Sequence, residues 1–258
     1  MTKLWYDDVN YATSRELLYN IQSHADTKSS SDHASNRLFS HLDESHLFSR
    51  PTYSTLLALL NNYYRNLGTP EHQTYTEDAE VSSFLTEISK SQIMVEAHKF
   101  LYSKGLASSS MTSFVRQLKT IWFTLYSRSS HSGSSRDTCA FEHVFVGETT
   151  NSKVDGFHSW IQFYLQEKAG HLNYLGYVFT RRPSVVAVHF SWYSKIKNVS
   201  TFIMGTSPEF DMAMLTTCFL ARPNSLCQFS IDGQDVQIKT YDVPHERQRL
   251  IATAYVYN

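Results

Sequence analysis

Apolar side chains in the first half of the chain recur with the spacing of amphipathic helices. Three such stretches lie at residues 51–68, 76–101 and 111–125. The first two end at or shortly before a glycine, and Thr76 can cap the second, with two acidic residues following it. The third places apolar residues at i, i+3, i+4 and i+7. Residues 1–130 are therefore predicted to form a helical region.

The second half of the chain has the residue types of β-strands. Residues 185–190 and 251–257 are rich in β-branched and aromatic side chains, and each predicts a strand. Residues 227–231 and 236–241 lie on either side of an Asp-Gly pair, a combination that predicts a β-hairpin.

Two further helices are predicted among these strands. One covers residues 157–168. The other covers residues 209–220, where Ser207 can serve as N-cap and Pro208 as the first helical residue. Helices followed by a mixed, mainly antiparallel sheet predict an α+β fold.

A serine-rich segment separates the two halves. Residues 127–135 hold six Ser and one Gly in nine residues, which is typical of a loop or short linker. This segment sets the predicted boundary between the helical region, 1–130, and an α+β region, 139–258. The two regions are expected to form one domain together.

The charge balance limits the kind of surface that the protein can offer. In 258 residues, Lys and Arg number 23 against 24 Asp and Glu. Such a chain has no long-range positive field, so any contact with nucleic acid would depend on a local site and not on a broad basic groove. With 41% hydrophobic and 18% charged residues, the composition excludes a disordered chain.

Other features leave the compartment and the thiol chemistry open. No stretch approaches the ~20 apolar residues of a membrane span. Residues 1–8 do not resemble a signal peptide, and both a secreted and an intracellular location stay open. Cys139, Cys218 and Cys227 have no zinc-like spacing. Cys218 and Cys227 either pair or remain buried thiols.

Two histidines with nearby carboxylates are the strongest candidates for chemistry. His143 and His158 are fifteen residues apart, with a loop-like stretch between them, and Glu142 and Glu148 lie beside His143. The spacing does not suit zinc, whose ligands lie closer together in the sequence. Two facing imidazoles suit phosphodiester cleavage in RNA, because one can accept the 2′-hydroxyl proton while the other protonates the leaving 5′-oxygen.

The blocks around these histidines resemble the signature blocks of the EndoU endoribonucleases. They are residues 142–148 (EHVFVGE) and 154–160 (VDGFHSW). Four further blocks match the family in the same order, at residues 43–53, 203–210, 221–223 and 251–255. The resemblance thus covers nearly the whole chain. It implies the EndoU fold and an enzyme that cleaves single-stranded RNA at uridylates, leaving 2′,3′-cyclic phosphate and 5′-hydroxyl ends.

The resemblance also implies a set of site residues. His143 and His158 match the catalytic pair, with His158 as general base and His143 as general acid. The catalytic lysine is Lys195 or Lys197, and we choose Lys197 because the family has a hydroxyl residue four positions later, here Thr201. Thr201 and Tyr255 match the uracil site. The family has Ser more often than Thr at position 201, so the hydroxyl is kept and a methyl group is added.

Metal use and partners follow from the same resemblance. Family members are stimulated by manganese or calcium, so we expect Mn²⁺ or Ca²⁺ to act outside the chemical step, with Glu142 and Glu148 as candidate ligands. The protein is expected to be a monomer that binds single-stranded RNA. Two alternatives are a non-catalytic RNA-binding module of the same fold and a metal-dependent phosphodiester hydrolase. The glycosylation motif at residues 198–200 lies beside Lys197 and is expected to be unused.

Overall fold

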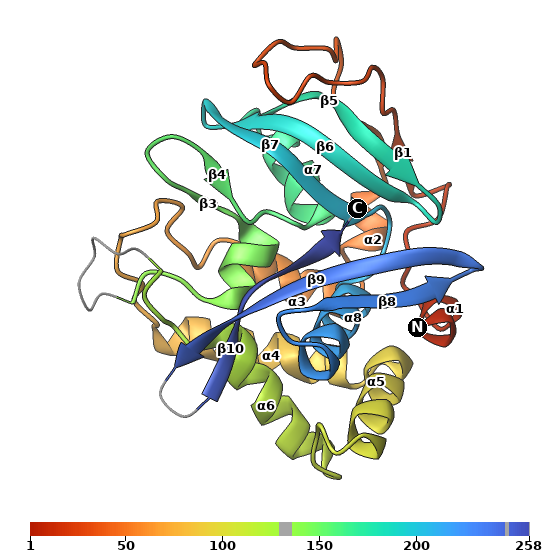
Figure 1. The fold of residues 1–258 in the computed structure, drawn as a ribbon, viewed down its shortest axis with the longest axis vertical. Coiled ribbons are helices and arrows are strands. Elements are labelled where there is room, and N and C mark those ends of the chain that lie inside the picture. Colours follow the sequence, from red (N-terminus) through yellow and green to blue (C-terminus); the bar gives the residue numbers. More distant parts are fainter. Residues whose placement is uncertain (129–135, 246–247, 258) are drawn as a thin grey trace.

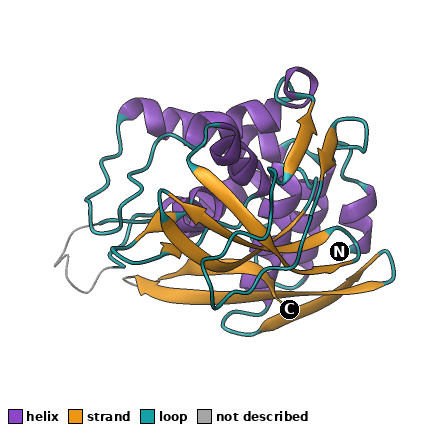
Figure 2. Cartoon of the chain, turned by 90° about the horizontal axis from the view of Figure 1, so that it is seen from above, coloured by secondary structure: helices purple, strands orange, loops and turns teal. Residues whose placement is uncertain are grey.

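The fold combines a helical layer with two three-stranded sheets. The computed structural model describes residues 1–128, 136–245 and 248–257. Figure 2 shows most helices on one side of the molecule and the longer strands on the other. The helices are α1 (Thr2–Tyr6), α2 (Glu44–Leu47), α3 (Pro51–Leu59), α4 (Tyr75–Ser89), α5 (Gln92–Ser103), α6 (Met111–Phe123), the π-helix η1 (Glu142–Val146), α7 (Trp160–Lys168) and α8 (Pro208–Ala221).

The strands pair antiparallel throughout the named sheets. One sheet has the order β5-β6-β7 and the other β10-β9-β8, and β1-β2 and β3-β4 form two short pairs (Figure 1). The strands are β1 (Leu17–Tyr19), β2 (Phe39–Leu42), β3 (Glu148–Thr149), β4 (Val154–Asp155), β5 (Leu172–Arg181), β6 (Val185–Trp192), β7 (Lys195–Ile203), β8 (Leu226–Ile231), β9 (Gln234–His245) and β10 (Gln248–Tyr257). The α+β fold predicted from the sequence is confirmed.

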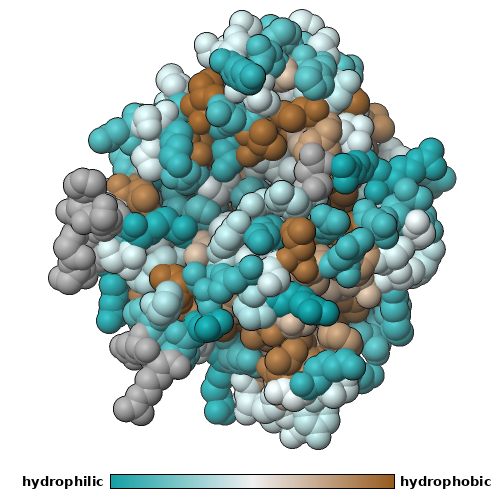
Figure 3. All heavy atoms as spheres, in the orientation of Figure 1, coloured by the Kyte–Doolittle hydropathy of each residue, from teal (hydrophilic) through white to brown (hydrophobic). Residues whose placement is uncertain are grey.

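The hydrophobic core is shared between the two halves of the chain. The buried cluster includes Leu56 and Phe84 from the first half and Phe210 and Val256 from the second. Helix α8 connects them, because it packs against α3, α4 and α5 as well as β9 and β10. Its N-terminus is the one predicted, since the Ser207 hydroxyl accepts from an amide of the first turn and Pro208 follows. On the face drawn in Figure 3, hydrophilic residues cover most of the surface, and hydrophobic ones lie in separate groups between them.

Helix boundaries in the first half differ from those predicted. Helix α3 ends at Leu59 and does not reach residue 68, because the chain turns and the Tyr64 amide donates to a Glu71 carboxylate oxygen. The stretch predicted as one helix is two, α4 and α5, since Ser91 ends the first and caps the second. The cap of α4 is Thr74 and not Thr76, because Thr74 forms a reciprocal capping box with the glutamate three residues later.

In the second half, the local patterns are confirmed and two strands are additional. The β8–β9 hairpin, β6 and β10 occur where the sequence predicts them. Neither β5 nor β7 is indicated by the sequence pattern, because register shifts interrupt the alternation of each strand. The serine-rich segment lies, from residue 129 to 135, outside the described residues.

The cysteines resolve the alternatives left by the sequence. Cys218 of α8 and Cys227 of β8 form a disulfide with their Cα atoms 5.5 Å apart, and Cys139 is a buried free thiol. In the described parts of the chain, no helix has both the length and the apolar character needed to cross a lipid bilayer.

Candidate active site

A short segment between η1 and α7 brings the two predicted histidines together. His143 lies in η1, His158 lies just before α7, and the β3–β4 hairpin connects them. The Phe157 amide donates to the His143 carbonyl oxygen at 2.8 Å, and the His158 amide donates to the Val144 carbonyl oxygen at 2.6 Å. The two histidine-bearing segments are therefore joined directly through their backbones.

Gly156 permits this close approach, and its replacement should be costly. Its φ is +63°, and a Cβ placed there would lie 1.8 Å from the His143 carbonyl oxygen. We expect Gly156→Ala to lower the free energy of unfolding by more than the ~1–2 kcal/mol of left-handed strain, because the backbone must also move. Gly170→Ala is the matched control, since its φ is +77° and no atom lies within 4 Å of the added Cβ. Urea denaturation measures both, and equal losses would contradict the expectation.

The histidines open onto a cleft of about 400 Å³ between the two sheets. Lys197 and Thr201 of β7 and Tyr255 of β10 line the same cleft as His143 and His158. The five residues predicted for catalysis and uracil binding thus lie around one space. Glu142 and Glu148 do not line it.

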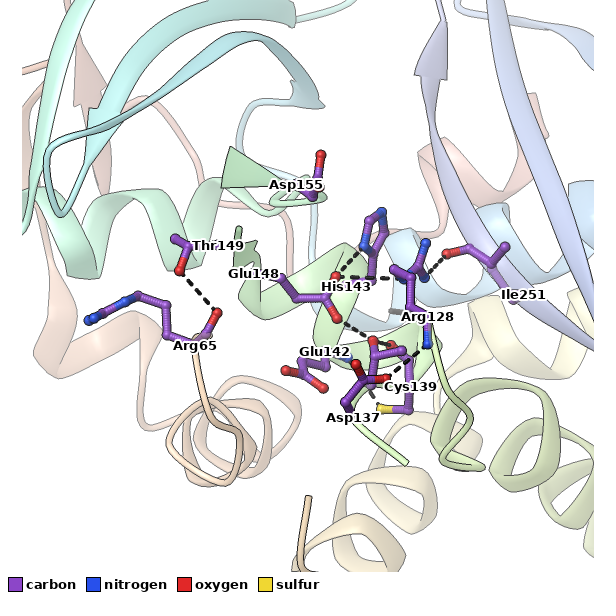
Figure 4. A network of polar contacts seen from close by, with 12 residues as sticks. Arg65, Arg128, Asp137, Cys139, Glu142, His143, Glu148, Thr149, Asp155 and Ile251 are labelled. Atoms are coloured by element: carbon purple, nitrogen blue, oxygen red, sulfur yellow. Dashed lines mark hydrogen bonds and ion pairs between the residues drawn. The ribbon is translucent and has the colours of Figure 1, made fainter. Parts of the chain in front are cut away.

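Glu148 holds the ring of His143. Its Oε2 lies 2.6 Å from His143 Nδ1 and 3.7 Å from Arg128 Nε, and the Thr138 hydroxyl donates to Oε1 (Figure 4). Although burial opposes ionisation, His143 and Arg128 hold the pKa of Glu148 below its usual range. Glu148 is therefore a carboxylate, which accepts a hydrogen bond from His143 Nδ1 and leaves Nε2 for other partners. Burial and the Arg128 charge lower the pKa of His143, and Glu148 opposes that shift.

Ser200 and Tyr255 fix the ring of His158. His158 Nδ1 lies 3.1 Å from Ser200 Oγ, and the Ser200 hydroxyl donates its single proton to the Phe157 carbonyl oxygen. Ser200 can then only accept from His158, which places the proton of the neutral ring on Nδ1. The Tyr255 ring stacks on His158 with centroids 5.1 Å apart and planes 16° apart. Burial, followed by nearby positive charge, lowers the pKa of His158 well below its usual value.

The structure distinguishes the two candidate lysines. Lys197 lines the cleft, whereas the Lys195 ammonium donates to the Asn151 carbonyl oxygen at 2.9 Å in the β3–β4 turn. Burial lowers the pKa of Lys197 to about 8, and the Asp155 carboxylate opposes that shift. The Lys197 side chain therefore still carries a positive charge at neutral pH.

Thr201 joins the two sheets where they border the cleft. Its side chain is buried, and its hydroxyl donates to the Val256 carbonyl oxygen of β10. Because the one hydroxyl proton is used in this bond, the oxygen has only lone pairs to offer to a ligand.

Glu142 and Glu148 do not fit the metal site expected from the sequence. Glu148 lies between Glu142 and the His143 ring, as Figure 4 shows. Both Glu142 oxygens are buried without a hydrogen-bond partner, and burial with the charges of Glu148 and Glu71 raises its pKa well above the usual range. Hard cations prefer several oxygen ligands. In the described ranges, no three His, Cys, Asp or Glu side chains are placed to hold a metal ion together.

Sequence reasoning misses two residues beside the histidines. Arg128, after α6, contacts Glu148 and donates to the Ala252 carbonyl oxygen, a partner 124 positions away that no local pattern indicates. Ser200 belongs to the glycosylation motif at 198–200. Its side chain is 1% exposed, so its use in the site is consistent with an unused motif.

Comparison with known proteins gives one consistent family. A family model described as "Endoribonuclease XendoU" matches residues 1–256. "Uridylate-specific endoribonuclease" of Bos taurus is 41% identical over 265 residues, which cover 98% of this chain and 63% of that protein. "Uridylate-specific endoribonuclease C" of Xenopus laevis is 39% identical over 259 residues, which cover 96% and 84%. The chain therefore spans about two thirds or less of the Bos taurus protein and more of the Xenopus laevis one.

A solved structure agrees over the whole fold. It is described as "The structure of XendoU: a splicing independent snoRNA processing endoribonuclease" and superposes with a TM-score of 0.82 at 35% sequence identity. The match covers 100% of this chain and 95% of the other. With the family model matching nearly every residue and the solved fold matching throughout, this chain belongs to the XendoU family of endoribonucleases.

Proposed function

We propose that the protein is an endoribonuclease that cleaves single-stranded RNA at uridylates, acting as a monomer. The observation that carries the proposal is the arrangement of His143, His158 and Lys197 around one cleft. The two rings are held by different partners, a carboxylate for His143 and a hydroxyl for His158. Two imidazoles in different environments suit a base and an acid acting on the same phosphodiester.

The hydrogen bonds support the order of proton transfer. The neutral His158 ring carries its proton on Nδ1, so its Nε2 lone pair can accept the 2′-hydroxyl proton. The Glu148 carboxylate stabilises the protonated form of His143, which can then donate from Nε2 to the leaving 5′-oxygen. No water enters this step, so the products are a 2′,3′-cyclic phosphate and a 5′-hydroxyl.

Lys197 supports the proposal through charge. The phosphorane formed by 2′-hydroxyl attack carries more negative charge than the substrate phosphate. A half-buried ammonium in a partly dry cleft stabilises that charge more effectively than one in water. Its lowered pKa, about 8, leaves it protonated at neutral pH.

Thr201 and Tyr255 support uracil as the preferred base. The Thr201 oxygen has lone pairs to offer, because its proton is donated to Val256. Uracil has an N–H at ring position 3 that can donate to this oxygen, whereas cytosine has a lone pair there. Tyr255 lies beside His158 and provides an aromatic surface, and base stacking is worth ~1–3 kcal/mol.

One assay separates this proposal from the two alternatives. Short oligoribonucleotides that differ in one base are incubated with the protein, and the end groups are identified. Cleavage after uridine with cyclic-phosphate ends supports the proposal. Binding without cleavage would indicate a non-catalytic RNA-binding module, and linear phosphates with strict metal dependence would indicate a metal-dependent hydrolase.

Manganese or calcium is proposed to stimulate the enzyme outside the chemical step. His143, His158 and Lys197 can supply both proton transfers and the charge stabilisation, so a cation would act on RNA binding or on the fraction of competent enzyme. We expect either metal to increase cleavage strongly, with residual cutting in chelator at high enzyme concentration and the same cyclic-phosphate ends. Single-turnover rates at saturating enzyme measure this. A chelated enzyme that binds RNA normally but does not cut would place the metal in the transition state.

A further inference from the structure

Three side chains from separate parts of the chain stack at the β6–β7 turn. The Arg65 guanidinium carbon lies 3.7 Å from the centroid of the Tyr193 ring. The His171 ring stacks on Tyr193 with centroids 4.7 Å apart and planes 24° apart. Two groups cannot share one face of the ring at these distances, so Tyr193 lies between them. His171 is exposed and Tyr193 is 38% exposed, which leaves this stack open to a ligand.

Arg65 in this stack has an unused capacity to bind an anion. It forms no ion pair with any carboxylate of the described residues. Its Nε is buried without a hydrogen-bond partner. Its backbone is anchored, because the Thr149 amide donates to the Arg65 carbonyl oxygen at 2.7 Å. A guanidinium that is already stacked on an aromatic ring loses little freedom when its N–H groups bind a phosphate.

Further positive charge and a hollow lie next to the stack. Lys195 begins β7, two residues after Tyr193, and Lys153 of the β3–β4 turn pairs with Ile196 in a β-bridge. A hollow of about 510 Å³ is lined by Arg37, His171 and Tyr193 together with neighbouring β5 and β6 residues. In a chain with almost no net charge, such a local group of cations is a feature that a polyanion can recognise.

Strand β7 gives the direction from the cleft to this stack. Thr201, Lys197 and Lys195 follow one another toward the turn, and Lys197 is four residues from Tyr193. At ~3.3 Å per residue this is about 13 Å, a distance that a few nucleotides span. In the proposed function the uracil lies near Thr201 and the scissile phosphate near Lys197. The chain beyond that phosphate is the 3′ side of the RNA.

We propose that Arg65, held by Tyr193, and Lys195 bind phosphates of the nucleotides on the 3′ side of the cleaved uridylate. This inference rests on the proposed function for its direction. The protein would then prefer RNA that continues beyond the cleaved bond over RNA that ends there. Tyr193 is a positioning residue, because it acts through Arg65.

The test uses oligonucleotides that bind without being cut. Each carries 2′-deoxyuridine at the target position and has one nucleotide after it, about five nucleotides on the 3′ side, or about five on the 5′ side. Fluorescence anisotropy gives the dissociation constants. We expect Arg65→Gln and Tyr193→Asn to weaken binding of the 3′-extended oligonucleotide about tenfold and leave the others unchanged. Asn suits the positive φ of 46° at position 193.

Controls separate a subsite from a structural role. Tyr193→Phe keeps the stack and should bind as the wild type does, and Lys90→Gln removes an exposed charge at the end of α4. The salt dependence of binding should fall by about 0.7 in log–log slope per lost phosphate contact in Arg65→Gln. Equal weakening of all three oligonucleotides, no weakening, or weakening of the 5′-extended one alone would overturn the proposal. Cleavage of matched ribonucleotides by the wild type is scored separately, so failure of the proposed function is distinguishable.

Discussion

Alanine in place of His143, His158 or Lys197 is expected to reduce cleavage of a uridine-containing oligoribonucleotide at least ~100-fold. All three side chains line the same cleft. In the proposed reaction, His158 accepts the 2′-hydroxyl proton, His143 protonates the 5′-oxygen and Lys197 stabilises the phosphorane, so no one of them can replace another. Single-turnover rates at saturating enzyme report the chemical step directly. Near-normal turnover in either histidine variant would remove the mechanism.

The histidine variants need controls for folding. His143→Ala leaves the buried Glu148 carboxylate without its partner, and an uncompensated buried charge can cost several kcal/mol. His143→Asn keeps an N–H donor for Glu148 and should lose activity with a smaller loss of stability. His72→Ala and Lys90→Ala change exposed residues of the same types and should cut RNA at the wild-type rate.

A substrate with 2′-deoxyuridine or 2′-O-methyluridine at the cleavage position is expected to bind and to resist cutting entirely. The proposed nucleophile belongs to the RNA, so its removal leaves His158 with no proton to accept. The measurement compares cleavage and affinity for three oligonucleotides that differ only at this sugar. Unmodified RNA should be cut, and all three should bind with similar affinity.

The opposite outcome would change the reaction class. Cleavage of the 2′-deoxy substrate requires a different nucleophile, and an activated water is the usual one in phosphodiester hydrolases. The metal-dependent alternative would then be favoured, and the linear phosphate ends would identify it.

Local sequence patterns predict the elements whose stabilising contacts are themselves local. The stripe of α6, the Ser207-Pro208 start of α8 and the Asp-Gly turn between β8 and β9 are examples, and each lies where the sequence indicates. The break between α4 and α5 is missed, because Ser91 can lie within a helix or cap one, and only packing decides between them.

Contacts between distant segments account for what the sequence does not reveal about the site. His143 and His158 are close in sequence and belong to recognisable blocks, so they are found readily. Arg128 and Ser200 act through partners far along the chain, and neither stands in a pattern that indicates such a partner. Glu142 looks equivalent to Glu148 in the sequence, but burial makes one a neutral acid and the other a paired carboxylate.

The bond between the Thr201 hydroxyl and the Val256 carbonyl has a mechanical consequence. The two histidines sit on one continuous segment closed by backbone hydrogen bonds, so their spacing is set within a single rigid unit. The base-binding residues Thr201 and Tyr255 belong to different sheets, which this bond fastens together. A small slide of one sheet past the other would widen the seat for the base and leave the proton-transfer pair untouched. Fidelity for uracil and the speed of bond breaking therefore depend on separate parts of the framework, and each can change in evolution without the other.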